Sequence, residues 1–186
     1  VFALVGESGS GKSVTALSIM ELLDQPPAVV SGSIRLDGVD IAGLGPAGLS
    51  QIRGRKVGMV FQDPMSSLNP VFTCGEQVME ALRAHAQHPA DKRISKPDAR
   101  RKVIEWFEKV KLPNPETIFS RYPHQLSGGQ KQRVMIAMAM CCEPSLLICD
   151  EPTTALDVSV QKMILQLIRE LQQQLGMGVI FITHDL

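Results

Sequence analysis

The sequence predicts an α/β fold in which a parallel β-sheet carries an inserted segment made only of helices. Two observations lead to this prediction: short apolar runs alternate with helical stretches over most of the chain, and one long central stretch shows helical patterns alone. Strands that alternate with helices pair in parallel, and helices cover both faces of the resulting sheet. The length of 186 residues suits one such domain.

Composition and charge exclude several classes of protein. Hydrophobic residues make up 44% of the chain and charged residues 20%, which is close to the average of folded domains. Lys and Arg total 19, and Asp and Glu total 19, so the formal net charge is zero. A general nucleic-acid binder would carry a basic excess, so we expect no nucleic-acid partner. No apolar run reaches the length of a membrane span.

The N-terminal part of the chain predicts three strands and one helix. Residues 1–5 are apolar and predict a buried strand, which a glycine-rich segment follows directly. Residues 14–23 have helical character. Residues 33–36 predict a strand that leads into a turn at Asp37-Gly38, and residues 56–61 predict another apolar strand.

The central part of the chain is richer in charge and predicts helices. Residues 75–110 carry apolar side chains at helical spacing, with a break near His88 and Pro89. Three prolines predict a loop over residues 113–123. Residues 128–142 predict a further helix.

The C-terminal part returns to alternating strands and helices. Residues 145–150 are apolar and predict a strand that ends in two carboxylates. Apolar residues recur at helical spacing over residues 160–175 and predict an amphipathic helix, which Gly176 and Gly178 would end. Residues 179–183 predict the last strand.

These segments predict a single, truncated domain over residues 1–186. Residues 1–73 and 143–186 would form the sheet part, and residues 74–142 would form the helical insert. The first residue lies inside an apolar run, and the last residue closely follows another. Domains rarely begin or end inside their core, so we expect a fragment of a longer protein.

The first motif that carries chemistry is Gly-Glu-Ser-Gly-Ser-Gly-Lys-Ser at residues 6–13, which matches the pattern G-x-x-x-x-G-K-S. Its glycines allow main-chain N–H groups to turn inward towards phosphate oxygens, and the helix that follows adds its positive end. Lys12 is expected to reach the β and γ phosphates, and the Ser13 hydroxyl to ligate Mg²⁺. The expected phosphate-binding residues are Gly6, Glu7, Ser8, Gly9, Ser10, Gly11, Lys12 and Ser13.

The second motif is the Asp150-Glu151 pair at the end of a predicted strand. The carboxyl ends of parallel strands are where α/β sheets bind ligands. Adjacent strand residues point to opposite sides, so the two acids can have separate roles. Asp150 would hold the Mg²⁺ ion with its water shell, and Glu151 would act as base towards an attacking water. Taken alone, an Asp-Glu pair after an apolar run can also be an ordinary strand end.

The third motif is Leu126-Ser127-Gly128-Gly129-Gln130, which precedes a predicted helix. On its own it is either a second anion site at a helix start or a simple turn with a helix cap. Together with the first two motifs it resembles the signature of ABC-type ATPases. The other elements of that family follow in order: Gln62 resembles the Q-loop glutamine, Asp157 the D-loop aspartate, and His184 the switch histidine.

The motifs narrow the resemblance to the ATPases of dipeptide, oligopeptide and nickel importers. Four segments carry this resemblance. Among them, the Ser-Leu-Asn-Pro run after Gln62 best distinguishes these importer ATPases from other ABC ATPases. These segments are residues 6–13, 61–70, 121–130 and 150–158.

The resemblance implies a P-loop NTPase (RecA-like) parallel sheet with an inserted all-helical ABC signature subdomain. It implies ATP and Mg²⁺ as cofactors, with Ser13, Gln62 and Asp150 at the metal. It further implies that two ABC ATPase domains pair head to tail, either as a homodimer or as a heterodimer. Each ATP would then be held by residues 6–13 of one domain and by residues 126–130 of the other.

The same resemblance implies a role for each remaining motif residue. Glu151 would polarise the attacking water, and His184 would contact the γ-phosphate and orient that water. Gln62 would sense Mg²⁺ on one side and a membrane permease subunit on the other. Asp157 would link the two ATP sites. The domain would work at the cytoplasmic face of the cell membrane with permease subunits, and indirectly with a periplasmic or lipid-anchored binding protein.

The function that the resemblance implies is ATP hydrolysis that powers the import of dipeptides or oligopeptides. One alternative is an ABC ATPase that drives import of nickel or another small solute. A second is a soluble ABC ATPase without transport, although the short stretch between Gln62 and Ser127 disfavours the chromosome and repair proteins, which place long coiled coils there. A third is a degenerate module without activity, which an intact Glu151 disfavours.

Overall fold

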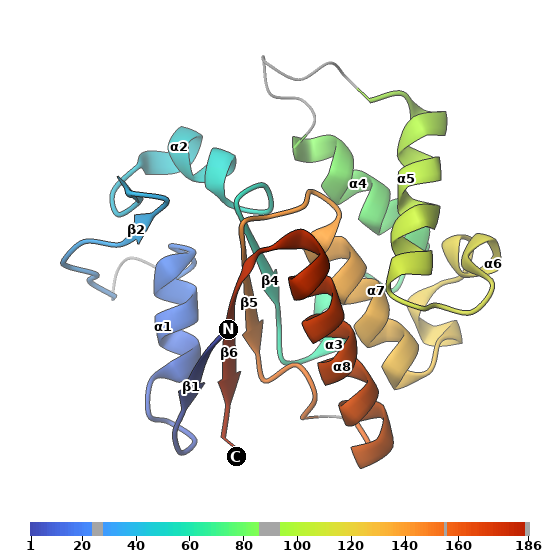
Figure 1. The fold of residues 1–186 in the computed structure, drawn as a ribbon. Helices are drawn as coiled ribbons and strands as arrows, with labels where there is room; N and C mark the ends of the chain where they lie inside the picture. Colours follow the sequence, from blue (N-terminus) through green and yellow to red (C-terminus); the bar gives the residue numbers. More distant parts are fainter. Residues whose placement is uncertain (24–27, 86–93, 155, 185–186) are drawn as a thin grey trace.

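The computed structural model describes residues 1–186 except for residues 24–27, 86–93, 155 and 185–186. Within the described residues, the central sheet has four parallel strands in the order β1-β6-β5-β4 (Figure 1). The strands are β1 (Phe2–Val5), β4 (Val57–Val60), β5 (Leu146–Asp150) and β6 (Gly178–Thr183). The predicted α/β class with a parallel sheet is therefore confirmed.

The strand order brings distant parts of the sequence to one edge of the sheet. Phe2 pairs with Ile180, and Leu146 pairs with Gly178, so β6 lies between the N-terminal strand and β5. All four strands run in the same direction, and their carboxyl ends meet at one edge. The segments that follow these ends carry the first two motifs together with Gln62 and His184.

Helices cover both faces of the sheet because successive side chains on a strand point to opposite sides. Ile148 and Ile182 pack with Ala16 and Met20 under helix α1 (Lys12–Ile19). Leu147, Cys149 and Val179 instead join a larger cluster with helices α7 (Gly128–Met140) and α8 (Val158–Leu175). This double burial explains why β4 and β5 have near-continuous apolar sequences. Strand β1, which was expected to be buried, is mostly exposed at one end of the strand order.

Helix α7 lies unusually close to strand β4. A Cβ atom at Gly58 would lie 2.3 Å from the main-chain oxygen of Ala139, which no side chain tolerates. Gly58 therefore allows the helix that begins at the third motif to pack directly on the sheet.

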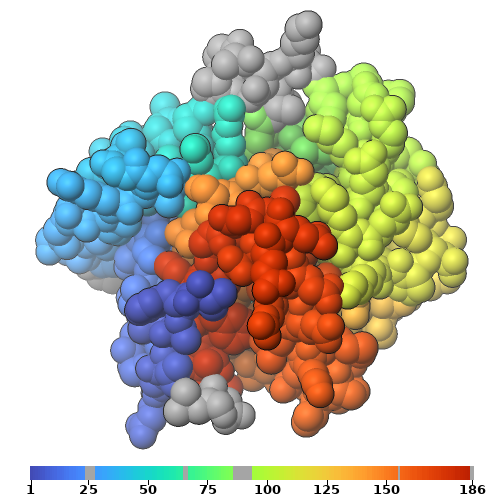
Figure 2. All heavy atoms as spheres, viewed as in Figure 1, coloured from blue at the N-terminus to red at the C-terminus, as the bar shows by residue number. Residues whose placement is uncertain are grey.

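Every regular element that the structure describes between Cys74 and Met140 is helical. These elements are α4 (Cys74–His85), α5 (Lys96–Lys109), α6 (Pro115–Phe119), a short 3₁₀ helix (Pro123–Gln125) and α7. Their buried residues, such as Val78, Phe107 and Ile136, belong to one cluster with Leu147 of the sheet. Figure 2 shows α5 and α6 (yellow-green) on the opposite side of the molecule from residues 28–44 (blue).

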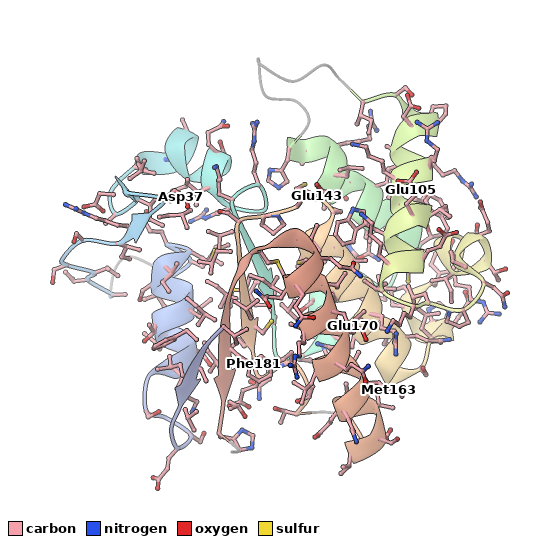
Figure 3. All side chains as sticks on the ribbon, in the orientation of Figure 1. Asp37, Glu105, Glu143, Met163, Glu170 and Phe181 are labelled. Atoms are coloured by element: carbon pink, nitrogen blue, oxygen red, sulfur yellow. The ribbon has the colours of Figure 1, made fainter. Side chains whose placement is uncertain are left out.

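Polar contacts also tie the helices of this part together. Glu170 of α8, labelled in Figure 3, accepts a hydrogen bond from Lys111, which follows α5. Glu143, which follows α7, lies 3.8 Å from Lys109 of α5. These are exposed ion pairs, which contribute little to stability.

Two of the expected elements have different limits. The stretch predicted as a loop over residues 113–123 contains α6 and the first residue of the 3₁₀ helix, because Pro115 and Pro123 occupy the first helical position, where a missing N–H costs nothing. Helix α1 spans Lys12–Ile19 rather than residues 14–23. The side chain of Arg53 donates to the main-chain oxygens of Met20 and Glu21 at 2.8 and 2.6 Å, which satisfies carbonyls at the end of this helix.

Within the N-terminal part, the strand expected over residues 33–36 is present at Arg35–Leu36, and further elements occur that the sequence patterns did not predict. Strand β2 (Arg35–Leu36) forms an antiparallel hairpin with β3 (Val39–Asp40) through the expected Asp37-Gly38 turn. Helices α2 (Gly45–Ile52) and α3 (Pro64–Ser67) flank β4 in the sequence. The expected break at His88 and Pro89 lies outside the described residues. No helix in the described part of the chain has the length and apolarity that crossing a membrane requires.

Candidate functional site at the carboxyl edge of the sheet

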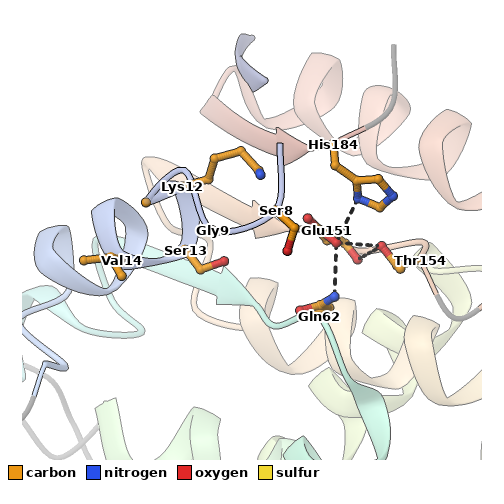
Figure 4. Close-up of a pocket in the computed structure, with 10 residues that line it drawn as sticks. Ser8, Gly9, Lys12, Ser13, Val14, Gln62, Glu151, Thr154 and His184 are labelled. Atoms are coloured by element: carbon orange, nitrogen blue, oxygen red, sulfur yellow. Dashed lines mark hydrogen bonds and ion pairs between the residues drawn. The ribbon is translucent and has the colours of Figure 1, made fainter. Parts of the chain in front are cut away.

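A cavity of about 430 Å³ lies at the carboxyl edge of the sheet (Figure 4). Its walls come from the loop after β1, the end of β4, the turn after β5 and the end of β6. The lining residues are Ser8, Gly9, Gly11, Lys12, Ser13, Val14, Gln62, Glu151, Thr154 and His184. The structure thus brings together residues of the first two motifs with Gln62 and His184, as the order of the motifs implied.

The loop over residues 6–13 curls into the start of α1. Gly9 and Gly11 have φ angles of 80° and 90°, a region in which a side chain would be strained. The ammonium group of Lys12 donates to the main-chain oxygens of Gly6 and Glu7 at 2.7 and 2.8 Å. This places a positive charge inside the curl, next to the positive end of a helix, which is the arrangement that binds phosphate groups.

Ser13 and Asp150 form the second feature of the site. The Ser13 hydroxyl donates to Oδ1 of Asp150 at 3.0 Å, although the two residues lie far apart in the sequence. Burial raises the pKa of Asp150 above its ordinary value, and the hydrogen bond from Ser13 opposes this shift.

The donor set at Ser13 and Asp150 fits Mg²⁺. This ion prefers oxygen ligands and takes one or two carboxylates, with phosphate oxygens and water completing its shell. Among the described residues, no group of three or more His, Cys, Asp or Glu side chains is placed to hold a metal by itself.

Glu151 is the third feature, and its backbone is strained. Its φ angle is 45°, which is rare for a residue with a side chain and typical of functional sites. Its main-chain N–H donates to the oxygen of Ile182 at 3.0 Å, which holds the turn against β6.

One oxygen of the Glu151 carboxylate, Oε2, has three partners (Figure 4). It accepts hydrogen bonds from Nε2 of Gln62 and Oγ1 of Thr154, both at 3.1 Å, and Nδ1 of His184 lies 3.1 Å away. Asp150 and Glu151 therefore have separate partners, in line with the expectation of separate roles. Gln62 was expected at the metal, but the structure places its amide nitrogen on Glu151. Its part in metal binding stays a prediction.

The third motif begins helix α7 and caps it. The Ser127 hydroxyl accepts from the main-chain N–H of Gln130 at 3.3 Å, and Oε1 of Gln130 accepts from the N–H of Ser127 at 3.0 Å. This reciprocal pair is a capping box. A Cβ atom at Gly129 would lie 2.8 Å from a methyl group of Val160, so the glycine permits close packing of α7 on α8. Leu126, which precedes the cap, is buried.

The third motif and Asp157 line a second cavity, of about 490 Å³. Residues 127–130 contribute to it, together with Lys111 and Arg133. Asp157 caps α8 by accepting from the N–H of Val160 at 3.0 Å. The first and second cavities have no lining residue in common, so within one chain the two glycine-rich motifs face different spaces. Ala155 of the expected D-loop lies outside the described residues.

Two residues of the site had no predicted role. Thr154 contacts Glu151, and the side-chain amide of Gln161 donates to the main-chain oxygens of Thr153 and Leu156 at 3.1 and 2.9 Å. A hydroxyl three residues after the expected base Glu151 is a sequence signal that could have indicated Thr154. No comparable signal precedes Gln161, because its contacts depend on the fold of the turn.

Comparison with known proteins places the chain in a family. The model of the family described as ABC transporter matches residues 1–154. Proteins called glutathione import ATP-binding protein, from Escherichia coli strain K12 and from Salmonella choleraesuis strain SC-B67, are 50% and 51% identical over 190 aligned residues. Each alignment covers 99% of this chain and 30% of the relative, so the chain spans about a third of the length of these relatives.

Solved structures agree with this assignment. A dimeric post-hydrolysis state of the ATP-binding cassette MJ0796, bound to ADP and Pi, superposes with a TM-score of 0.83 at 32% identity, over 99% of this chain and 74% of that one. CbiO1 from Clostridium perfringens, part of the transporter complex cbiONQ, superposes with a TM-score of 0.79 at 29% identity, over 99% and 66% of the chains. The resemblance that the motifs predicted is thereby confirmed: the chain belongs to the ABC transporter family and has the fold of that family's ATP-binding cassettes.

Proposed function

We propose that this domain binds and hydrolyses ATP, and that the full-length protein uses this reaction to import small peptides. The observation that carries the proposal is the first cavity, where the Lys12 loop, the Ser13–Asp150 pair and Glu151 meet. The similarity to proteins named for glutathione import supports peptides as the substrate class.

ATP binding follows from the shape and charge of the loop over residues 6–13. The Lys12 ammonium, which now contacts two main-chain oxygens, would turn to the β and γ phosphates. Ser13 and Asp150, with Gln62, would hold Mg²⁺, which neutralises phosphate charge when bound. The buried Asp150 carboxylate, whose pKa burial raises, would gain from a nearby cation.

Hydrolysis requires a water molecule in line with the γ-phosphate, and Glu151 is the base that we assign to it. The catalytic problem in phosphoryl transfer is mainly one of positioning and charge. His184 would contact the γ-phosphate and orient the water, and Gln62 would complete the arrangement from the end of β4. Both residues already lie against Glu151 in the same cavity.

We further propose that two such domains pair head to tail around ATP. The two glycine-rich motifs of one chain face different cavities, so residues 127–130 would complete the nucleotide site of a partner domain. The dimeric state of MJ0796 supports this arrangement. ATP binding would close the dimer and hydrolysis would open it, because the γ-phosphate supplies the differential contact. Asp157, beside residues 127–130, would link the two sites.

The remaining parts of the proposal concern the assembled transporter. Residues 74–142 would act as the helical subdomain, and residues 1–73 and 143–186 as the core. Permease subunits would bind the domain at the cytoplasmic face of the membrane, with a binding protein delivering the peptide from outside.

The experiment compares wild-type and Glu151→Gln forms of the full-length protein. Each is reconstituted with its membrane partners in liposomes, with and without glutathione or other small peptides and the binding protein. We expect peptide-stimulated ATP hydrolysis in the wild type. The variant should retain ATP binding in a closed dimer and lose hydrolysis by about 100-fold or more, because the base is absent. Unchanged turnover in the variant would refute the assignment of Glu151, and hydrolysis that ignores every peptide would refute peptide import.

A further inference from the structure

The three partners of Glu151 Oε2 differ in what else they must do. In the proposed reaction, His184 contacts the γ-phosphate, and Gln62 serves the metal and the water. Both side chains lie on separate segments from Glu151, at the ends of β6 and β4. Both would therefore redirect their hydrogen bonds once nucleotide enters the cavity, and neither can be relied on to orient the carboxylate during hydrolysis.

Thr154 differs because it belongs to the same turn as Glu151. Its main-chain N–H and its hydroxyl each lie 3.3 Å from the main-chain oxygen of Glu151, and the hydroxyl lies 3.1 Å from Oε2. The contact therefore depends on local backbone geometry and not on the position of another strand. Thr154 also lines the first cavity, so its hydroxyl lies where the reaction would take place.

The turn that carries this contact is fixed at both ends. At its start, Glu151 is held by the hydrogen bond from its N–H to Ile182. Further on, the side chain of Gln161 binds the main-chain oxygens of Thr153 and Leu156 from the first turns of α8. A donor mounted on such a turn keeps its place relative to the carboxylate.

We propose that Thr154 is a positioning residue, whose hydroxyl fixes Oε2 of Glu151 so that the other carboxylate oxygen faces the attacking water. This inference rests on the proposed function of Glu151 as the base. The terminal torsion of a glutamate side chain is broad, so a carboxylate without a fixed donor samples many orientations. Small misplacements of reacting groups cost large factors in rate.

The expected effect separates turnover from binding. Thr154→Val preserves the shape of the side chain and removes the donor. We expect kcat for ATP hydrolysis to fall by roughly tenfold, because the base loses its orientation. The affinity for ATP and the KM should stay within about twofold, because the hydroxyl of Thr154 bonds to Glu151 and not to the phosphate-binding loop.

Three variants of the full-length protein, reconstituted with its membrane partners, test this. Thr154→Ser keeps the hydroxyl and should restore kcat to within about twofold of the wild type. Thr153→Val makes the same change one residue earlier, and should leave kcat near the wild-type value. A readout that does not depend on turnover is the ATP-dependent dimer, which should form in Thr154→Val and persist longer, because hydrolysis that would open it is slower.

The outcomes separate the inference from the proposed function. If the wild type hydrolyses ATP and Thr154→Val does so equally fast, the role of Thr154 is wrong while Glu151 can still be the base. The inference is also wrong if Thr154→Ser is as slow as Thr154→Val, or if Thr154→Val has lost ATP binding, since either result indicates a merely structural residue. A wild type without any hydrolysis would instead refute the proposed function itself.

Discussion

At the scale of single residues, Lys12 is the side chain on which the proposed nucleotide binding should depend most. It is buried, and its ammonium group satisfies two main-chain oxygens of the loop in the structure. These bonds hold the charge in the curl where phosphates would bind, and phosphate oxygens would replace the two main-chain acceptors.

Lys12→Ala removes this charge and should weaken ATP binding by at least about 100-fold, since it removes charge-assisted hydrogen bonds to the phosphates, which are roughly twice as strong as neutral ones. Titration with a fluorescent ATP analogue measures the effect. Lys96→Ala, an exposed lysine at the start of α5, is the matched control and should bind normally. Equal affinity in the Lys12 and Lys96 variants would reject the phosphate-binding role of the loop.

At the scale of elements, the contact between α7 and α8 explains why the third motif contains glycine. Gly129→Ala places a methyl group 2.8 Å from Val160. We expect a loss of about 1–3 kcal/mol in the free energy of unfolding, as overpacked cores show. Denaturant titration measures it, and Val160→Ala should compensate. The double variant should then lose less than the sum of the single variants. Simple additivity would contradict the proposed clash.

Helix α8 also has a cap whose strength depends on pH. Hydrogen bonds from the Ser159 hydroxyl and the Val160 N–H lower the pKa of Asp157 below its ordinary value of 3.8. Because the pKa of Asp157 is lower in the folded state than in the unfolded chain, the ionised cap stabilises the folded protein above pH 3.8. This stabilisation is lost as the pH falls through the folded-state pKa. The midpoint temperature of thermal unfolding should therefore fall less between pH 7 and acidic pH in Asp157→Asn, which retains a neutral cap, than in the wild type. An identical decrease in both proteins would contradict this account.

The elements also show which parts of the fold can be read from sequence. Strands β4 and β5 were predictable because burial on both faces makes them apolar, whereas β1 is apolar in sequence and yet mostly exposed. The end of α1 was not predictable, because Arg53 sets it from a distant part of the chain. The helix at Pro115 was missed because proline favours both loops and first helical turns. In the site, motif order was enough to place Lys12 in the same cavity as Glu151, whereas the contacts of Gln161 depend on how the turn folds, which no sequence pattern indicates.

At the scale of the whole molecule, the separation of the two cavities has a consequence for assembly. A nucleotide held by Lys12 cannot also contact Ser127 of the same chain if the first and second cavities stay apart. Ser127 and Gly128 are exposed in the single chain, as expected of residues that would contact the nucleotide of a partner domain. Each nucleotide site in a head-to-tail pair then draws on two chains, and damage to either motif disables a different half of the site.

A mixing experiment tests this division. Lys12→Ala and Ser127→Arg should each abolish hydrolysis in the full-length protein, because both sites of either pair lack one half. In a mixture, a pair with one chain of each kind has one site with an intact loop and an intact Ser127. Random pairing should therefore restore roughly a quarter of the wild-type activity. A mixture as inactive as its parents would show that the opposing signature comes from a different ABC domain, so that this cassette pairs as a heterodimer.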